Sequence, residues 1–405
     1  MIKIDKEKRI YFDWAASSPC IINKNQQFYL FGNPSSLHTE GRAAKQALED
    51  ARERAAKVLN IQAENLFFTS GGTESNSIAL FSNLMRPGKR RIIFSQGEHA
   101  SIREGIETLA KLGKPVGSIP IDSLGRVTDV TLDKALSQYN DARFAAIMSV
   151  NNETGTVTDI ISLNKIFQNH SGGAHVHFHC DIAQAIGKIP VDLTGWDIDS
   201  ASLSAHKIGG PRGIGLLYLR KPIDIFYSGG GQENGIRGGT ENTQGAVILA
   251  DCLEQAVNGM VSNEAGAFYS TDLKNRNFEF TVNENYIKAK DRFKKFITAL
   301  KKIERCTLIP MDREADDDRF SPYILQTAFK DIPGEVMARA LDDLGFAVST
   351  GSACSSSSPE RPVLAAMGIN ENLSIEGIRI SQGYSTTDED IGLLLDAITG
   401  ILKFL

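Results

Sequence analysis

Short apolar segments alternate with amphipathic segments through more than half of this chain, and this alternation constrains the fold most strongly. The amphipathic segment at residues 42–59 has apolar residues every three or four positions, which is the period of a helix. Strands that alternate with helices need crossover connections, and these favour a mainly parallel sheet. We therefore predict an α/β fold with a mainly parallel central sheet flanked by helices. The strand-like segments are residues 65–70, 90–96, 144–150, 174–181, 199–207 and 213–220.

The length of the chain leaves room for more than this one unit. With 405 residues, of which 41% are hydrophobic, it can form two domains, or one large domain with an appendage. The strand and helix patterns fade in residues 261–286. We predict a large domain over residues 13–260 and a smaller α+β domain made of residues 1–12 and 261–405.

Charge and cysteine content exclude several classes of protein. The 44 basic and 49 acidic residues give a net charge of −5 without a basic arm, so we expect no nucleic-acid partner. No segment of about 18 apolar residues exists, which predicts a cytoplasmic protein that does not interact with membranes. The cysteines are odd in number and form no CxxC pair, so neither a disulfide framework nor a zinc ribbon is expected. They are Cys20, Cys180, Cys252, Cys306 and Cys354.

One lysine and one aspartate stand where a parallel sheet usually binds its ligand. Lys207 follows an apolar segment and precedes a glycine-rich turn, where its amine can form a Schiff base; the alternative is a surface lysine at a turn. Asp181 ends a strand and so faces the ligand crevice of an open parallel sheet; the alternative is a cap for the next helix.

A glycine-rich turn offers a phosphate site. The sequence Gly71-Gly72-Thr73 lies between a predicted strand and a predicted helix, so free N–H groups and the Thr73 hydroxyl can hold a phosphate there. The alternative is that the glycines serve the backbone only.

Three histidines alternate in the strand that ends at Asp181. His175, His177 and His179 share one face, which suggests a zinc or copper site together with Cys180. Cys180 points to the opposite face, however, and no second ligand cluster is evident. We therefore expect no metal.

Ten segments in a fixed order make the chain resemble the cysteine desulfurases of the NifS/IscS type, which are fold-type-I pyridoxal-phosphate enzymes of the class V aminotransferase family. The resemblance runs from about Tyr11 to Leu405 and implies conversion of L-cysteine to L-alanine, with transfer of the sulfur for iron–sulfur cluster assembly or other thiolation. The segments are "DWAASSP", "FGNPSSLH", "FTSGGTESNS", "GEHAS", "VNNETGTV", "CDIAQAIGKIPVD", "SAHKIGGPRGIG", "GGGQENGIRGGTEN", "TGSACSSS" and "GIRISQGY".

The resemblance assigns residues to the ring of pyridoxal 5'-phosphate. Lys207 matches the lysine that binds the cofactor as an imine and later moves a proton. Asp181 matches the partner of the pyridine nitrogen, whose protonation it maintains. His99 resembles the imidazole stacked on the ring, where it can act as acid or base. Gln184 and Asn152 resemble the residues that bind the phenolic oxygen.

The same resemblance assigns the phosphate site and implies a homodimer. The phosphate is expected at the helix start at Gly72, with hydrogen bonds from Thr73, Ser204 and His206. Thr240 matches a threonine that family members supply from the neighbouring subunit.

Substrate binding and sulfur transfer are assigned to three further residues. Arg379 matches the arginine that forms a bidentate pair with the substrate carboxylate, assisted by Asn33. Cys354, in a serine-rich segment that cannot pack as core, matches the cysteine that takes up the sulfur as a persulfide. A sulfur-acceptor protein is then the expected partner, either an iron–sulfur scaffold or a thiolation carrier.

Several departures keep other functions open. Residues 17–34 and the segment after Cys354 are shorter than in the family, and residues 261–286 have no clear counterpart. One alternative is a selenocysteine lyase or another fold-type-I aminotransferase or lyase. Another is a sulfur-handling scaffold without turnover, which the complete set of expected catalytic residues argues against.

Overall fold

The computed structural model describes residues 9–20, 31–88, 90–170, 175–258, 284–351 and 361–404. Cys354 therefore lies outside the described residues. The same holds for most of the 261–286 segment and for residues 21–30.

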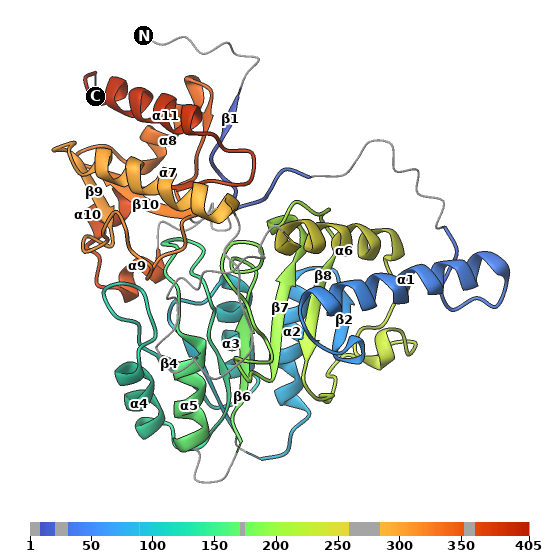
Figure 1. The fold of residues 1–405 in the computed structure, drawn as a ribbon. Helices are drawn as coiled ribbons and strands as arrows, with labels where there is room; N and C mark the ends of the chain where they lie inside the picture. Colours follow the sequence, from blue (N-terminus) through green and yellow to red (C-terminus); the bar gives the residue numbers. More distant parts are fainter. Residues whose placement is uncertain are drawn as a thin grey trace.

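A seven-stranded sheet forms the centre of the molecule (Figure 1), in the order β2-β8-β7-β6-β5-β3-β4. Neighbouring strands are parallel except that β8 runs antiparallel to both β2 and β7. The predicted mainly parallel sheet is thus confirmed. The strands are β2 (Leu66–Thr69), β3 (Arg91–Ser95), β4 (Val116–Ile119), β5 (Ala142–Ala146), β6 (His177–Asp181), β7 (Ser200–Ser204) and β8 (Gly215–Leu219).

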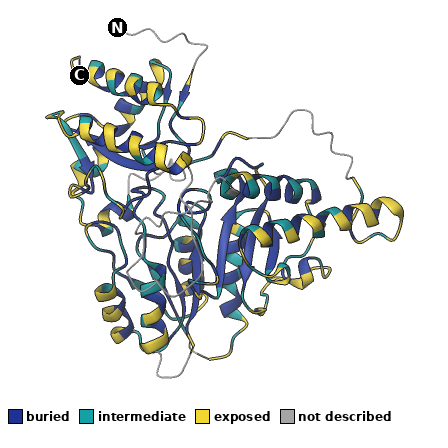
Figure 2. Cartoon of the chain, in the orientation of Figure 1, coloured by how far each residue is buried: buried dark blue, intermediate teal, exposed yellow. Residues whose placement is uncertain are grey.

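Helices cover both faces of this sheet, and each face has its own apolar core. Alternate strand residues pack with α1, α4, α5 and α6 on one face and with α2 and α3 on the other. In Figure 2 the strands are buried, whereas the helices expose their outer sides. The helices are α1 (Thr39–Val58), α2 (Gly72–Phe81), α3 (Ala100–Lys111), α4 (Asp129–Gln138), α5 (Ile160–His170) and α6 (Thr243–Asn258), with short 3₁₀ turns η1 (Ala63–Asn65), η2 (Ser82–Leu84), η3 (Ala205–Lys207) and η4 (Glu233–Gly235).

Strand β4 was not among the predicted strands. Its sequence, Val-Gly-Ser-Ile, has only two β-branched apolar residues, and glycine and serine weaken the strand signal. It forms nevertheless because it pairs with β3 at the edge of the sheet, where tertiary pairing outweighs local propensity.

The C-terminal elements, orange and red in Figure 1, gather at one end of the large sheet. They contain an antiparallel sheet in the order β12-β10-β9, and their strand β11 pairs in parallel with the N-terminal strand β1, which is blue in Figure 1. The strands are β1 (Ile10–Tyr11), β9 (Cys306–Ile309), β10 (Ile324–Phe329), β11 (Phe346–Ala347) and β12 (Gly377–Ser381), and the helices are α7 (Glu284–Leu300), α8 (Gly334–Asp343), α9 (Pro362–Ala366), α10 (Glu371–Glu376) and α11 (Asp388–Ile401).

A separate apolar core belongs to these C-terminal elements. Ile10 and Phe12 join this core, together with residues of α7, α8 and α11. This grouping supports a smaller domain made of residues 1–12 and 261–405, a division that we retain as a proposal. No helix within the described ranges is long and apolar enough to cross a bilayer.

Candidate active site

A cavity of about 590 Å³ lies where β6 and β7 end and where α2 and α3 begin. In an open parallel sheet this is the edge at which ligands bind. The cavity brings together residues that are far apart in the sequence, and ten of the predicted site residues line it. They are Gly72, Thr73, His99, Asn152, Asp181, Gln184, Ser204, His206, Lys207 and Arg379.

One end of the cavity is built from backbone N–H groups. Helix α2 starts after Gly71, and no side chain caps its first turn. Gly71 has a φ of 153°, a conformation that side chains rarely adopt. Ser204 lies close by, because a Cβ added to Gly72 would stand 3.6 Å from its Cβ. Uncapped N–H groups at the start of a helix form an anion site of the kind that a phosphate fills.

Asp181 is held in place at the end of β6. Its Oδ1 accepts a hydrogen bond from the Ala183 N–H at 2.9 Å, and its Oδ2 accepts one from Asn76 Nδ2 at 3.0 Å. The contact with Ala183 stabilises a turn and caps no helix, because the next element after β6 is β7, and Asp181 also faces the cavity. Sequence reasoning missed Asn76, which lies in α2.

Two of the three alternating histidines form a buried hydrogen-bonded chain with Asn76. Asn76 donates to Asp181 through Nδ2, so its Oδ1 accepts from His179 Nε2, at 2.8 Å. Burial lowers the pKa of His179 to about 4, and the neutral ring then accepts at Nδ1 from the Ser200 hydroxyl at 2.8 Å. Ser200 in turn accepts from His177 Nε2 at 2.7 Å.

This arrangement gives the histidine-rich strand a role other than metal binding. Hydrogen bonds occupy both ring nitrogens of His179 and Nε2 of His177. The two imidazoles also stack on Phe144 in the core. Across the described part of the chain, no group of three or more metal-ligating side chains is found. His175 is exposed and contacts Asp199.

Lys207 lies in η3, directly after β7, and its amine points into the cavity wall formed by the N-terminal segment. Nζ donates to the carbonyl oxygens of Ala15 and Ala16 at 2.7 and 2.9 Å. Gln184 donates to the same Ala15 oxygen at 2.8 Å. The two side chains thus meet at one carbonyl group.

His99 caps helix α3 and so has a defined proton position. Its Nδ1 accepts from the backbone N–H of Ser101 at 3.2 Å, which leaves Nε2 as the protonated nitrogen of the neutral ring. Burial lowers the pKa of His99, and the charge of Asp181 partly offsets this effect. At neutral pH His99 can therefore offer an N–H to a group in the cavity.

Arg379, in β12, is almost fully buried and is only partly paired. Nη1 donates to the carbonyl oxygens of Asn152 and Gly351, and Nη2 pairs with Asp13 Oδ1 at 2.8 Å. Its Nε has no hydrogen-bond partner among the described residues. A buried guanidinium with one unfilled donor beside a cavity can bind a carboxylate.

Two buried carboxyl groups line the cavity and were not predicted. Glu98 accepts from the Met148 N–H at 2.6 Å, and burial raises its pKa to about 8, so it retains a proton at neutral pH. Burial also raises the pKa of Glu153, against the charges of Arg379 and Arg361. Their only signal in the sequence was their presence in the quoted segments "GEHAS" and "VNNETGTV".

Three predicted residues do not line the cavity within the described residues of this chain. Asn33 is exposed in the turn before α1, where its Oδ1 accepts from the Ser35 N–H. Thr240 is exposed as well, beyond η4. Cys354 lies outside the described residues, although Gly351 and Pro362, on either side of its segment, both line the cavity.

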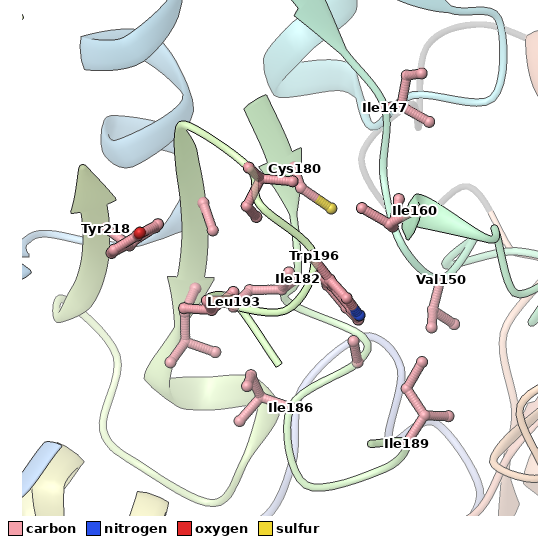
Figure 3. Close-up of a cluster of buried hydrophobic side chains, with 14 of the residues drawn as sticks. Ile147, Val150, Ile160, Cys180, Ile182, Ile186, Ile189, Leu193, Trp196 and Tyr218 are labelled. Carbon is pink, nitrogen blue, oxygen red and sulfur yellow. The ribbon is translucent and has the colours of Figure 1, made fainter. Parts of the chain in front are cut away.

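The described cysteines are unsuited to nucleophilic chemistry at this site, because none of them lines the cavity. Cys180 lies within the apolar core, among side chains such as Ile182 and Trp196 (Figure 3), and burial raises its pKa well above the ordinary value. Burial also raises the pKa of Cys252 to about 12 and that of Cys306 to about 11. A thiol with so high a pKa holds little thiolate at neutral pH.

Together these groups fit pyridoxal phosphate. The uncapped start of α2 suits its phosphate, the carboxylate of Asp181 suits its pyridine nitrogen, and the amine of Lys207 suits its aldehyde. The fold and the cavity define an enzyme of the fold-type-I, pyridoxal-phosphate-dependent class.

Comparison with known proteins narrows this class. The family model for class V aminotransferases matches residues 10–267. Over 98% of this chain, 34% of residues are identical to the cysteine desulfurase IscS of Dictyoglomus turgidum, with 95% of the relative covered. The IscS of Rickettsia felis is also 34% identical, with 96% and 90% covered. The chain belongs to the class V aminotransferase family, as a member of its NifS/IscS-type cysteine desulfurases.

Solved structures agree with this assignment. A NifS-like protein superimposes with a TM-score of 0.82 at 31% identity, covering 98% of this chain and all of the other. A structure described as SspA in complex with cysteine has a TM-score of 0.72 at 26% identity and covers 94% of this chain and all of the other.

Proposed function

We propose that the protein removes sulfur from L-cysteine, releasing L-alanine, and transfers the sulfur as a persulfide on Cys354. The observation that carries this proposal is the single cavity that collects Lys207, Asp181, His99 and Arg379 beside both flanks of the Cys354 segment. The curated relatives named cysteine desulfurase support it, as does the neighbour solved with cysteine. They do not favour the selenocysteine lyase or aminotransferase alternatives.

Bound pyridoxal phosphate supplies an electron sink for the carbon that bears the substrate's amino group. Asp181, fixed by Asn76, would keep the pyridine nitrogen protonated, as this sink requires. Lys207 would hold the cofactor through Nζ, and the same nitrogen could move the proton of that carbon. Arg379, which lines the cavity, would bind the substrate carboxylate. His99, whose Nδ1 accepts from the Ser101 N–H, would offer its Nε2–H to a group bound in the cavity.

The transfer step needs a thiolate that can reach the substrate. Cys354 Sγ attacks the sulfur of the bound cysteine, so that an S–S bond forms while the C–S bond breaks. The bond electrons go to carbon, which takes up a proton and leaves as alanine. The persulfide then passes its outer sulfur to an acceptor, which we propose is an iron–sulfur scaffold or a thiolation carrier. No described cysteine lines the cavity and could replace Cys354 in this step.

We also propose a homodimer in which Thr240 completes the phosphate site of the neighbouring subunit. In support, Thr240 is exposed and lies outside the cavity of its own chain. Large apolar side chains nearby in the sequence and before α1 are exposed too, as a subunit interface would require. They are Phe31, Leu37, Phe226 and Tyr227.

The experiment is alanine formation from L-cysteine by wild-type protein and by Cys354→Ala. We expect the variant to bind pyridoxal phosphate as wild type does but to lose turnover by orders of magnitude, because only the nucleophile is removed. Cys306→Ala is the matched control and should retain activity. Wild-type protein given cysteine without reductant should gain one sulfur on the peptide that contains Cys354. Undiminished turnover by Cys354→Ala, or a persulfide mapped to another cysteine, would contradict the proposal.

A further inference from the structure

Lys188 is a buried lysine next to the active site. Its side chain is nearly inaccessible, at 7% exposure, and it forms no ion pair with a carboxylate in the described part of the chain. Burial, together with the charges of Lys207 and Arg379, lowers the pKa of Lys188 to about 7. Lys188, Lys207 and Arg292 line a small cavity of about 250 Å³. An apolar side chain would fill this place at lower cost, so a buried lysine here points to a function.

The backbone fixes where Lys188 stands. It follows the turn after β6, in which Gly187 has a φ of 71° and packs against α6. A Cβ added to Gly187 would stand 2.8 Å from the Cβ of Ala256. The glycine therefore lets the turn pack closely against α6, and this packing sets where the backbone places Lys188.

The amine of Lys188 contacts the side-chain amide of Gln184. Nζ donates to Gln184 Oε1 at 2.6 Å, while Gln184 Nε2 donates to the Ala15 carbonyl oxygen at 2.8 Å. Protonated Lys188 can only donate, so if the amide turned over in that state, Nε2 would face the ammonium group and Oε1 would face a carbonyl oxygen. Both contacts would then be repulsive, so Lys188 and Ala15 together select one orientation of the amide.

The orientation of the Gln184 amide decides whether it presents an N–H donor or an oxygen acceptor to the cavity. The Ala15 oxygen also accepts from Lys207 Nζ at 2.7 Å, so its two lone pairs are both used. Gln184 Nε2 has two hydrogens, and one remains after the bond to Ala15. Because Gln184 lines the cavity, it can present an N–H there rather than an oxygen.

We propose that Lys188 is a positioning residue that holds the Gln184 amide with its N–H toward the phenolic oxygen of the cofactor. The inference rests on the proposed function, because it assigns the cavity to pyridoxal phosphate. An N–H donor stabilises negative charge on that oxygen. The donor also lowers the pKa of the neighbouring nitrogen, which links the cofactor to Lys207. The reason is that the stabilised oxygen attracts the proton of this nitrogen less strongly.

The test is an absorbance titration of the cofactor-loaded protein, which reports the pH at which that linking nitrogen loses its proton. In Lys188→Met the amide is no longer held, so the proton is bound more tightly. We expect the midpoint to rise by about one pH unit, the tenfold change that one hydrogen bond to a charged oxygen provides. Lys188→Arg retains a cation that can only donate, and its midpoint should stay near that of wild type.

A double-mutant comparison separates positioning from simple charge. In a Gln184→Ala background, Lys188→Met should move the midpoint by less than half as much as it does in wild type, because the amide is already gone. An equal shift in both backgrounds would show that Lys188 acts through its charge alone and would overturn the inference. Thermal unfolding of each apo-protein, together with its affinity for pyridoxal phosphate, identifies variants that are misfolded.

Failure of the proposed function would be visible separately. If wild-type protein developed no visible absorption band with pyridoxal phosphate, or if Lys207→Ala retained that band after borohydride reduction, the cofactor assignment itself would be wrong. An unchanged midpoint in folded Lys188→Met, with a normal wild-type band, would refute the role of Lys188 only.

Discussion

Among single residues, Ser200 has a buried hydroxyl group that connects a hydrogen-bond network. Its side chain is fully buried and joins His177 to His179. The chain continues through Asn76 to Asp181, so one serine supports a polar path between the sheet core and the cavity. A buried network of this kind is stable only while every member has a partner.

We predict that Ser200→Ala destabilises the protein. Two imidazole nitrogens would remain without a partner in the core, at a cost of about 1–3 kcal/mol for each unsatisfied group. Thermal unfolding of the apo-protein measures the loss. His175→Ala is the matched control, because His175 precedes β6 by two residues and 72% of its side chain is exposed, and its effect should stay within about 0.5 kcal/mol. Equal melting temperatures for Ser200→Ala and wild type would count against the chain.

The residues of the cavity were largely predictable, whereas their contacts were not. Lys207, Asp181 and the Gly71-Gly72-Thr73 turn follow strands, and the ends of parallel strands meet at one edge. The pairing of Asp13 with Arg379, by contrast, joins positions 366 residues apart. Contacts over such distances depend on how the units pack, which periodicity and motifs do not encode. The link from Lys188 through Gln184 to Ala15 was unpredicted for the same reason.

At the scale of elements, the start of β8 is packed against the turn that begins the phosphate site. A Cβ on Gly215 would stand 2.6 Å from both Gly71 Cα and the Leu203 carbonyl oxygen. Both are backbone atoms, which cannot rotate away as a flexible side chain can. The glycine therefore lets β8, β7 and the Gly71 turn approach one another.

We predict that Gly215→Ala weakens the affinity for pyridoxal phosphate and destabilises the fold. Separating these elements should cost about 1–3 kcal/mol, as overpacking a core does. Fluorescence titration with the cofactor and thermal unfolding measure the two effects. Gly392→Ala in α11 is the control: a Cβ there meets no atom within 4 Å, and alanine should stabilise the helix by about 0.5–1 kcal/mol. Wild-type affinity in Gly215→Ala would exclude the turn from the phosphate site.

The segment that ends in Thr240 is anchored to its own subunit by a buried ion pair. Arg52 of α1 binds Glu233 of η4 through two hydrogen bonds, of 2.7 and 2.8 Å, and the Phe68 N–H donates to the same carboxylate. Only 8% and 1% of the two side chains are exposed. A paired and fully bonded charge of this kind holds the segment in one place at the surface, where a second copy can meet it.

At the scale of the whole molecule, a shared site predicts complementation between defective subunits. Thr240→Ala protein and Lys207→Ala protein should each bind the cofactor poorly or without a covalent bond. A mixed dimer would place both defects in one site and leave the other site intact. We expect co-refolded mixtures to recover up to one functional site per mixed dimer, measured as borohydride-fixed cofactor and alanine formation. Absence of any recovery, with dimers shown by sedimentation, would argue against the shared site.

The pairing of β1 with β11 also constrains when the fold can be completed during protein synthesis. Ile10 lies opposite Phe346, although every strand of the seven-stranded sheet has been made once Leu219 has left the ribosome. The large sheet can therefore assemble while residues 10–12 still wait for a partner more than 300 positions away. Ala15, whose carbonyl oxygen binds Lys207, also donates its N–H to Ser381 Oγ, so we expect the amine to reach its final surroundings only when translation is nearly finished.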